Sequence, residues 1–235
     1  MTPTALHSLF EGLAWLSAIA VGWWARRRYF TEPLPLPGGR YPLYLLVLWL
    51  GAALGAYGLG DLNLRFASMT GSGRSILGAL VGGIAAAEVY KAAFGIRGST
   101  GAVFVLPLSI AIAIGRVGCF LAGLADYTYG TPTAMPWGVD FGDGVHRHPV
   151  QLYESLSMAG FAVFFLWLLQ RRPRIAAAGG FYLFAGFYGA QRFAWEFLKP
   201  YPAVVGPFNV FHLAAAGLVL YAVFMLLRRG IHAFA

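Results

Sequence analysis

The sequence predicts an all-α integral membrane protein with about seven transmembrane helices. Of its 235 residues, 59% are hydrophobic and only 11% are charged, and the mean hydropathy is +0.66. Several apolar runs are about 20 residues long, which is the length that a helix needs to cross a bilayer. A soluble protein of this size would need far more polar surface, so that class is disfavoured.

The expected helices follow one another with short connections. Their ranges are about 6–25, 42–60, 76–94, 102–123, 151–170, 179–198 and 207–227. The first run ends in Arg26–Arg28, so it is expected to be a retained span rather than a cleaved signal. The Pro/Gly segment 33–39 is expected to be a loop, and about 124–150 a polar extracytoplasmic loop. With no internal repeat evident, residues 1–235 are expected to form a single transmembrane domain.

The basic residues predict the orientation of these helices. Eleven of the 17 lysines and arginines fall on one side if the chain crosses the membrane seven times. They are Arg26, Arg27, Arg28, Arg40, Lys91, Arg97, Arg171, Arg172, Arg174, Arg228 and Arg229. The positive-inside rule then places the N-terminus outside and the C-terminus in the cytoplasm. Since these charges flank apolar runs, the net charge of +8 does not indicate a nucleic-acid partner.

A second group of charged residues lies within or beside apolar segments near the expected outer leaflet. It comprises Arg116, Arg147, His148, Glu154, Arg192 and Glu196. Charge in this environment is costly unless it is paired or used. Arginine binds phosphate through two parallel hydrogen bonds, so three arginines at headgroup depth indicate a phospholipid headgroup site. Arg192 and Glu196 are four residues apart and are expected to pair on one helical face.

Catalytic and structural roles both remain open for these side chains. Glu196 or Glu154 is a candidate general base, and His148 has a suitable intrinsic pKa for proton transfer. In structural roles, Arg192 and Glu196 form a buried ion pair, and Arg116 reaches carbonyls or the interface. Arg147 and His148 would then anchor the interface, while Glu154 would only complement a helix N-terminus.

Three other polar residues are expected to be structural. Glu88 is expected to pair with Lys91 one turn away. His212 is expected to be a satisfied core residue, and Cys119 a small buried hydrophobe. Because Cys119 is the only cysteine, an intrachain disulfide is excluded and a metal cluster is disfavoured.

Three motifs together resemble the prolipoprotein diacylglyceryl transferases of bacteria. The family's glycine-arginine signature and its continuation are matched by Gly115, Arg116, Gly118, Phe120, Gly123, Tyr129, Gly130, Pro132 and Thr133. The family's RHP-x-QLYE motif is matched by Arg147, His148, Pro149, Gln151, Leu152, Tyr153 and Glu154. The family's R-x-x-x-EF motif is matched by Arg192, Glu196 and Phe197. The resemblance extends from about Gly51 to the end and also implies seven spans with an outside N-terminus.

The resemblance implies transfer of the diacylglyceryl group of phosphatidylglycerol to a cysteine thiol of a lipoprotein precursor, with release of glycerol phosphate. It implies that Arg116 and Arg192 neutralise the phosphate, that Glu196 orients Arg192, and that His148 is a candidate for proton transfer. Substrate contacts are expected at Arg147, Glu154, Tyr153, Gln151, Gly118, Gly123 and Gly130. No cofactor and no metal ion are expected, and the protein is expected in the bacterial inner membrane.

The chain departs from the family pattern on the acceptor side. Leu77 stands where the family has the histidine of a His-Gly-Gly motif, and Cys119 stands where it has asparagine. Leu124 occupies a glutamate position on a direct count, with Asp126 as a substitute if the loop is shifted. A transferase with a different nucleophilic acceptor, or a non-catalytic lipid-binding membrane protein, therefore remains an alternative. A transporter is disfavoured because the unusual charges cluster near one face.

Overall fold

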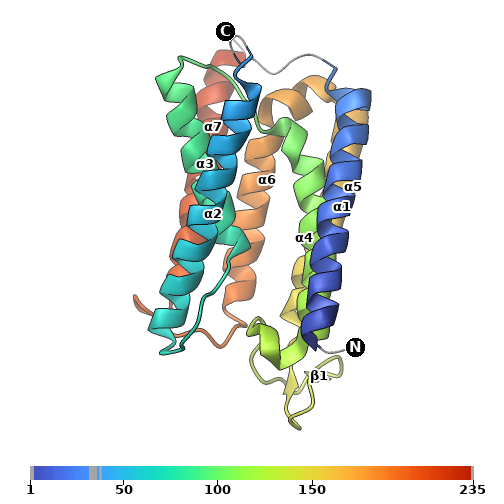
Figure 1. The fold of residues 1–235 in the computed structure, drawn as a ribbon, viewed down its shortest axis with the longest axis vertical. Coiled ribbons are helices and arrows are strands. Elements are labelled where there is room, and N and C mark those ends of the chain that lie inside the picture. Colours follow the sequence, from blue (N-terminus) through green and yellow to red (C-terminus); the bar gives the residue numbers. More distant parts are fainter. Residues whose placement is uncertain (1–2, 32–35, 37–38, 234–235) are drawn as a thin grey trace. The chain divides into compact units, whose positions relative to one another are not determined.

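The computed structural model describes residues 3–31, 36 and 39–233, and this part of the chain contains seven α-helices (Figure 1). The helices are α1 (Pro3–Tyr29), α2 (Tyr41–Phe66), α3 (Ile76–Ala93), α4 (Ala102–Ala122), α5 (Val150–Arg171), α6 (Pro173–Glu196) and α7 (Val210–Ala233). The expected all-α class is confirmed. Most of the Pro/Gly loop expected at 33–39 lies outside the described residues.

Six of these helices are long and apolar enough to cross a membrane, namely α1, α2, α3, α4, α5 and α7. The chain is therefore a multi-pass membrane protein. Helix α6 is not among these six, and it carries Arg174, Arg192 and Glu196. Its 24 residues are nevertheless about 36 Å long, which is enough to span the hydrocarbon core.

The chain divides into two compact units. One unit comprises Met1–Thr31 and Gly101–Pro200, and so contains α1, α4, α5 and α6. The other comprises Glu32–Thr100 and Tyr201–Ala235, and so contains α2, α3 and α7. In the second unit, α2 and α3 approach closely, because a Cβ added at Gly55 would lie 2.2 Å from the backbone oxygen of Gly78. Glycine at such a crossing lets two membrane helices pack backbone against backbone.

Three helix boundaries lie six residues from those expected, and one of them is the end of α7 at Ala233 rather than near residue 227. Helix α6 begins at Pro173 rather than near residue 179, and only Arg172 separates it from α5. Proline is compatible with the first turn of a helix, where its missing N–H is not needed. Helix α2 continues to Phe66 rather than ending near residue 60.

The expected polar loop contains ordered structure. A short 3₁₀ helix, η1 (Gly123–Asp126), follows α4, and a hairpin of β1 (Val139–Asp140) and β2 (His146–Arg147) comes after it. The hairpin lies beyond the end of α4, at the end of the unit where α1 begins (Figure 1). The Thr131 N–H donates to the Leu198 carbonyl at 2.6 Å, and the His148 N–H donates to the Thr131 carbonyl at 3.1 Å. The loop is thereby attached to the segment that follows α6.

Candidate functional site

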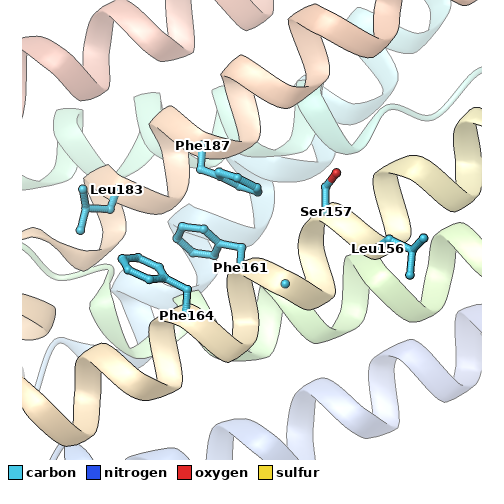
Figure 2. A pocket seen from close by; sticks show the side chains of 7 residues that line it. Leu156, Ser157, Phe161, Phe164, Leu183 and Phe187 are labelled. Atoms are coloured by element: carbon cyan, nitrogen blue, oxygen red, sulfur yellow. The ribbon is translucent and has the colours of Figure 1, made fainter.

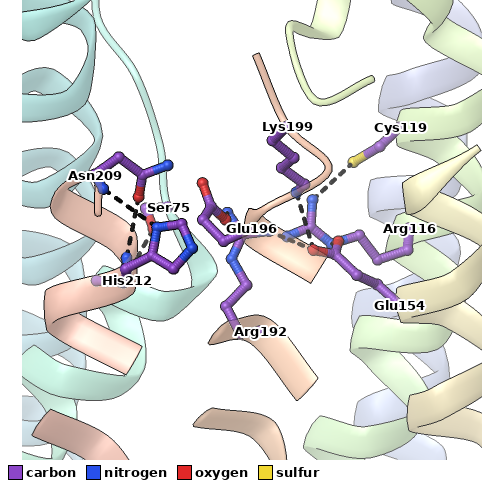
Figure 3. Close-up of polar contacts among 10 residues, drawn as sticks. Ser75, Arg116, Cys119, Glu154, Arg192, Glu196, Lys199, Asn209 and His212 are labelled. Carbon is purple, nitrogen blue, oxygen red and sulfur yellow. Dashed lines mark hydrogen bonds and ion pairs between the residues drawn. The ribbon is translucent and has the colours of Figure 1, made fainter. Parts of the chain in front are cut away.

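Five charged side chains meet in the first unit and form what we call the ion cluster. It contains Arg116 from α4, Glu154 from α5, Arg192 and Glu196 from α6, and Lys199 just beyond α6 (Figure 3). Glu154 lies at the centre. Its Oε2 is 2.6 Å from Arg116 Nε, while its Oε1 is 2.9 Å from Lys199 Nζ and also accepts a hydrogen bond from Arg192 Nη1.

The ion cluster is almost completely shielded from solvent and carries an excess of positive charge. None of its side chains is more than 7% exposed. Two arginines and one lysine face two glutamates, so the formal net charge of the five groups is +1. A buried charge that lacks a counterion costs several kcal/mol in effective terms. The arrangement therefore favours an additional anion.

Local helix geometry places the charged groups together. Arg192 Nη2 and Glu196 Oε2 are 2.9 Å apart on successive turns of α6, which confirms the pairing expected from the sequence. The Ser155 hydroxyl donates to the Ala113 carbonyl at 2.7 Å, which fastens the start of α5 to α4. Arg116 lies one turn after Ala113 in α4, and Glu154 directly precedes Ser155 in α5. The bond therefore brings Glu154 alongside Arg116.

Lys199 belongs to this cluster, although the sequence did not identify it as a site residue. It follows the last turn of α6, and its backbone N–H donates to the Glu196 carbonyl at 3.1 Å. Burial, together with the nearby positive charge of Arg192, lowers the pKa of Lys199 to about 8. Glu154 opposes this shift because it stabilises the protonated form.

Two buried glutamines supply further polar groups on the helices that carry the cluster. Gln151 on α5 is fully buried, and Gln191 on α6 is 9% exposed. Within the described part of the chain, neither side-chain amide has a hydrogen-bond partner. Buried amides normally find partners, so these groups are available to a bound polar ligand.

His148 of the loop and Tyr153 of α5 form a separate hydrogen-bonded group. His148 Nδ1 lies 3.3 Å from the Tyr153 hydroxyl oxygen, which also accepts a hydrogen bond from Trp137 Nε1 at 2.7 Å. The Tyr153 ring packs against the ring of Trp195, with centroids 5.2 Å apart. These contacts connect the loop to α6 and fix the position of the imidazole.

Arg147 has partners of its own in the loop. Its guanidinium donates to both carboxylate oxygens of Asp143 at 2.7 Å, and it lies 5.2 Å from the centre of the Tyr129 ring. These hydrogen bonds lower the pKa of the Asp143 carboxyl. Arg147 therefore stabilises the hairpin, whereas its expected contact with substrate remains a prediction.

The three glycines expected at the site have clear backbone roles. Gly118 lets α4 approach α1, since an added Cβ would lie 2.5 Å from the Cβ of Phe10. Gly123 ends α4 with a positive φ of 63°. At Gly130 an added Cβ would lie 2.3 Å from the carbonyl oxygen of His148. Each glycine helps to position a motif residue through the backbone.

An apolar groove of about 480 Å³ lies between α5 and α6. Figure 2 shows its lining, which includes the phenyl rings of Phe161, Phe164 and Phe187 and the side chain of Leu156. Leu156 follows Glu154 by two positions, and Phe187 precedes Arg192 by five. The groove thus shares its two helices with the ion cluster.

The polar residues expected to be structural in the second unit are indeed paired. Lys91 Nζ donates to Glu88 Oε1 at 2.9 Å, which confirms the expected pair. His212 is buried, and its Nδ1 accepts from the Asn209 N–H at 3.2 Å (Figure 3). Leu77, which replaces the family histidine, is a buried core residue of α3.

The sequence predicted no metal ligands, but folding brings three ligand-type side chains together in the first unit. They are His7, Cys119 and Asp126, and their ligand atoms all lie within 4.8 Å of one another. The three residues come from three different elements, so no spacing in the sequence signals the group.

Comparisons with known proteins agree with the geometry. The family model described as prolipoprotein diacylglyceryl transferase matches residues 7–228. The phosphatidylglycerol–prolipoprotein diacylglyceryl transferase of Nitratidesulfovibrio vulgaris is 32% identical over 216 residues, covering 83% of this chain and 78% of the relative. The enzyme of that name from Geobacter sulfurreducens is 32% identical over 156 residues, covering 64% of this chain and 57% of the relative.

A further relative of the same name, from Bordetella parapertussis, is 40% identical over 120 residues, which cover 49% of this chain and 42% of the relative. No solved structure matches the chain. The match over residues 7–228 extends across nearly the whole sequence and includes every member of the ion cluster. The chain belongs to the prolipoprotein diacylglyceryl transferase family.

Proposed function

We propose that this protein transfers the diacylglyceryl group of phosphatidylglycerol to a cysteine thiol of a lipoprotein precursor. The observation that carries the proposal is the ion cluster, a buried set of charges with a formal net charge of +1 at the family's motif positions. An anionic phosphate diester is the headgroup chemistry that this charge excess fits. The unpartnered side-chain amides of Gln151 and Gln191 would donate hydrogen bonds to the headgroup's oxygens.

The transfer step forms one bond and breaks another. The acceptor sulfur attacks the glyceryl carbon of the donor, the carbon–oxygen bond to phosphate breaks, and the electron pair leaves with glycerol phosphate. Arg116 and Arg192 would stabilise the negative charge that develops on the leaving group, an effect worth about 3–4 kcal/mol for one well-placed donor. Glu196 would hold Arg192 in position, as their 2.9 Å contact suggests.

The acceptor thiol must lose its proton before it attacks, because the thiolate is the nucleophile. Leu77 has no ionisable group and cannot accept that proton. His148 is the candidate acceptor, since its imidazole is held beside Tyr153 in the loop that follows α4. Arg147 would lie at the entrance that the acceptor uses.

We place the site at the outer leaflet of the bacterial inner membrane, with seven spans. This topology requires α6 to cross the membrane together with the six more apolar helices. The basic ends of the helices then lie in the cytoplasm, in keeping with the positive-inside rule. The N-terminus, the ion cluster and the hairpin would lie toward the outside.

The groove between α5 and α6 would hold one acyl chain of the donor, and this assignment is testable at Gly160. Gly160 lines the groove and an added Cβ there would meet nothing within 4 Å, so a leucine side chain would occupy groove space. Gly160→Leu is expected to lower kcat/KM for long-chain phosphatidylglycerol by about tenfold or more. Turnover of short-chain and long-chain donors, measured side by side, checks this.

Gly217→Leu is the matched control, because Gly217 lies in α7 and an added Cβ there also meets nothing within 4 Å. Both substitutions make the same change within a helix. Equal loss of activity in the two variants, or no loss in Gly160→Leu, would contradict an acyl-chain groove.

Binding of phosphatidylglycerol is expected to weaken as the pH rises through about 8, where Lys199 loses its proton. Below that pH the ion cluster keeps its net charge of +1, whereas above it the net charge falls to zero and the anionic headgroup loses an attraction. Donor affinity measured between about pH 6.5 and 9.5 checks this. Lys199→Arg should extend tight binding to the alkaline end, since arginine stays charged. The same decline in both proteins would contradict the role of Lys199.

The direct test incubates purified protein with labelled phosphatidylglycerol and a lipobox peptide that contains one cysteine. Release of glycerol phosphate, together with a lipidated peptide, is the expected result. Release only with a non-thiol nucleophile would replace the lipoprotein acceptor but keep the transferase. No release with a broad panel of acceptors would leave a non-catalytic lipid-binding protein and overturn the proposal.

A further inference from the structure

His7, Cys119 and Asp126 converge from three elements of the first unit. His7 lies in the second turn of α1, Cys119 lies near the end of α4, and Asp126 is the last residue of η1. One nitrogen, one sulfur and one carboxylate oxygen lie within 4.8 Å of one another. None of the three has a role in the proposed transfer reaction.

The backbone around Cys119 is shaped to bring these side chains together. Gly118 allows α1 to approach α4, because an added Cβ would lie 2.5 Å from the Cβ of Phe10. Gly123, with φ of 63°, then turns the chain at the end of α4 so that Asp126 faces back toward His7. The convergence therefore follows from two glycine positions that tolerate no larger side chain without rearrangement.

The His7 nitrogen and the Asp126 carboxylate lie close together but are not hydrogen-bonded to each other. His7 Nδ1 is buried and has no hydrogen-bond partner among the described residues, although it lies 3.3 Å from Asp126 Oδ1. The Thr128 hydroxyl donates to the other oxygen, Asp126 Oδ2, at 2.6 Å. Such an outer hydrogen bond fixes the carboxylate and leaves Oδ1 directed at the cluster, as around protein-bound metals.

The donor set selects the kind of ion. Imidazole nitrogen with thiolate sulfur suits zinc and its neighbours in the transition series, whereas magnesium and calcium prefer oxygen ligands alone. Tetrahedral zinc places its ligand atoms roughly 3.5 Å apart, and the three ligand atoms here lie within 4.8 Å of one another. Three protein ligands leave a fourth position for water.

Charge balance and access also fit a dication. One thiolate and one carboxylate neutralise a divalent cation, so the loaded site would be formally uncharged at the edge of the bilayer. Arg116 Nη1 lies 3.9 Å from Cys119 Sγ and donates toward the sulfur. The side chains of His7 and Asp126 are 27% and 16% exposed, which gives the ion a path from solvent.

We propose that His7, Cys119 and Asp126 form a binding site for one divalent transition-metal ion of the zinc class. The ion links the start of α1 to the end of α4 and to η1. Asp126 and Cys119 contribute the negative charge, and His7 contributes a neutral imidazole. On binding, the Cys119 thiol releases its proton to solvent and no electrons are transferred.

Cobalt titration of the purified full-length protein tests the site without any lipid substrate. After treatment with a chelator, Co²⁺ is expected to bind at one ion per chain with a thiolate-to-cobalt charge-transfer band in the near ultraviolet. Stoichiometric Zn²⁺ is expected to displace it. Absence of this band when the folded protein is saturated with Co²⁺ would overturn the proposal, and this readout needs no variant.

Variants identify the ligands. Cys119→Ser is expected to abolish the charge-transfer band, and Thr128→Val is expected to weaken Co²⁺ affinity about 10- to 100-fold through loss of the outer hydrogen bond. His146→Ala is the control, because this exposed hairpin histidine makes its hydrogen bond to Gly138 away from the three ligands. Unchanged Co²⁺ affinity in Cys119→Ser, or loss of the band in His146→Ala, would assign the metal elsewhere. Because transferase turnover is not measured, failure here leaves the proposed function standing.

Discussion

Glu154→Gln is expected to destabilise the protein by about 3–5 kcal/mol, the usual cost of breaking a buried ion pair from one side. Glutamine keeps the shape of the side chain but removes the carboxylate that Arg116, Arg192 and Lys199 share. The formal charge of the cluster would rise from +1 to +2. The midpoint temperature of thermal denaturation in detergent is expected to fall by on the order of 10 °C.

Two comparisons separate charge imbalance from general loss of packing. Adding Lys199→Met to Glu154→Gln returns the formal charge to +1, so the double variant is expected to be more stable than Glu154→Gln alone. Asp143→Asn breaks the exposed pair with Arg147 and is expected to leave the denaturation temperature nearly unchanged, because exposed ion pairs contribute little. Further destabilisation in the double variant would contradict an electrostatic origin.

The ion pairs of the protein illustrate which interactions could be predicted from the sequence. The pairs Arg192–Glu196 and Glu88–Lys91 were predictable, because residues three or four apart share a helical face. The central position of Glu154 was not predictable by that argument. Its partners come from other segments, and Arg192 is 38 positions away.

Lys199 and His7 were missed for related reasons. Lys199 follows the end of α6, where a basic residue also suits simple interfacial anchoring, and only the fold shows it buried against Glu154. His7 lies 112 positions before Cys119, so no ligand spacing was visible. The sequence drew attention to Asp126 only through its possible equivalence to a family glutamate.

The fold was predictable to the extent that hydrophobicity determines it. Long apolar runs correctly predicted the helices of a membrane protein, because a bilayer requires the backbone to satisfy its own hydrogen bonds. The early start of α6 at Pro173 was missed, since proline and arginine there resembled a loop. The β1–β2 hairpin was missed because two-residue strands carry almost no alternation to detect.

Arg192→Lys is expected to lower kcat for diacylglyceryl transfer by about 10²–10³-fold, with a smaller change in KM. Lysine keeps the positive charge, but it cannot contact Glu154 and Glu196 through separate nitrogens of a planar group, as Arg192 does. The phosphate would then meet a mobile point charge instead of an oriented guanidinium. Steady-state release of labelled glycerol phosphate measures both constants.

Arg97→Lys is the control, since Arg97 is exposed in a loop of the second unit and should leave both constants unchanged. An increase in KM alone in Arg192→Lys would mean that Arg192 binds donor and transition state equally well. Loss of kcat with donor binding retained would instead place its contribution in the transition state, where charge accumulates on the departing phosphate. This result would mean that Glu154 and Glu196 hold a catalytic guanidinium in a fixed orientation.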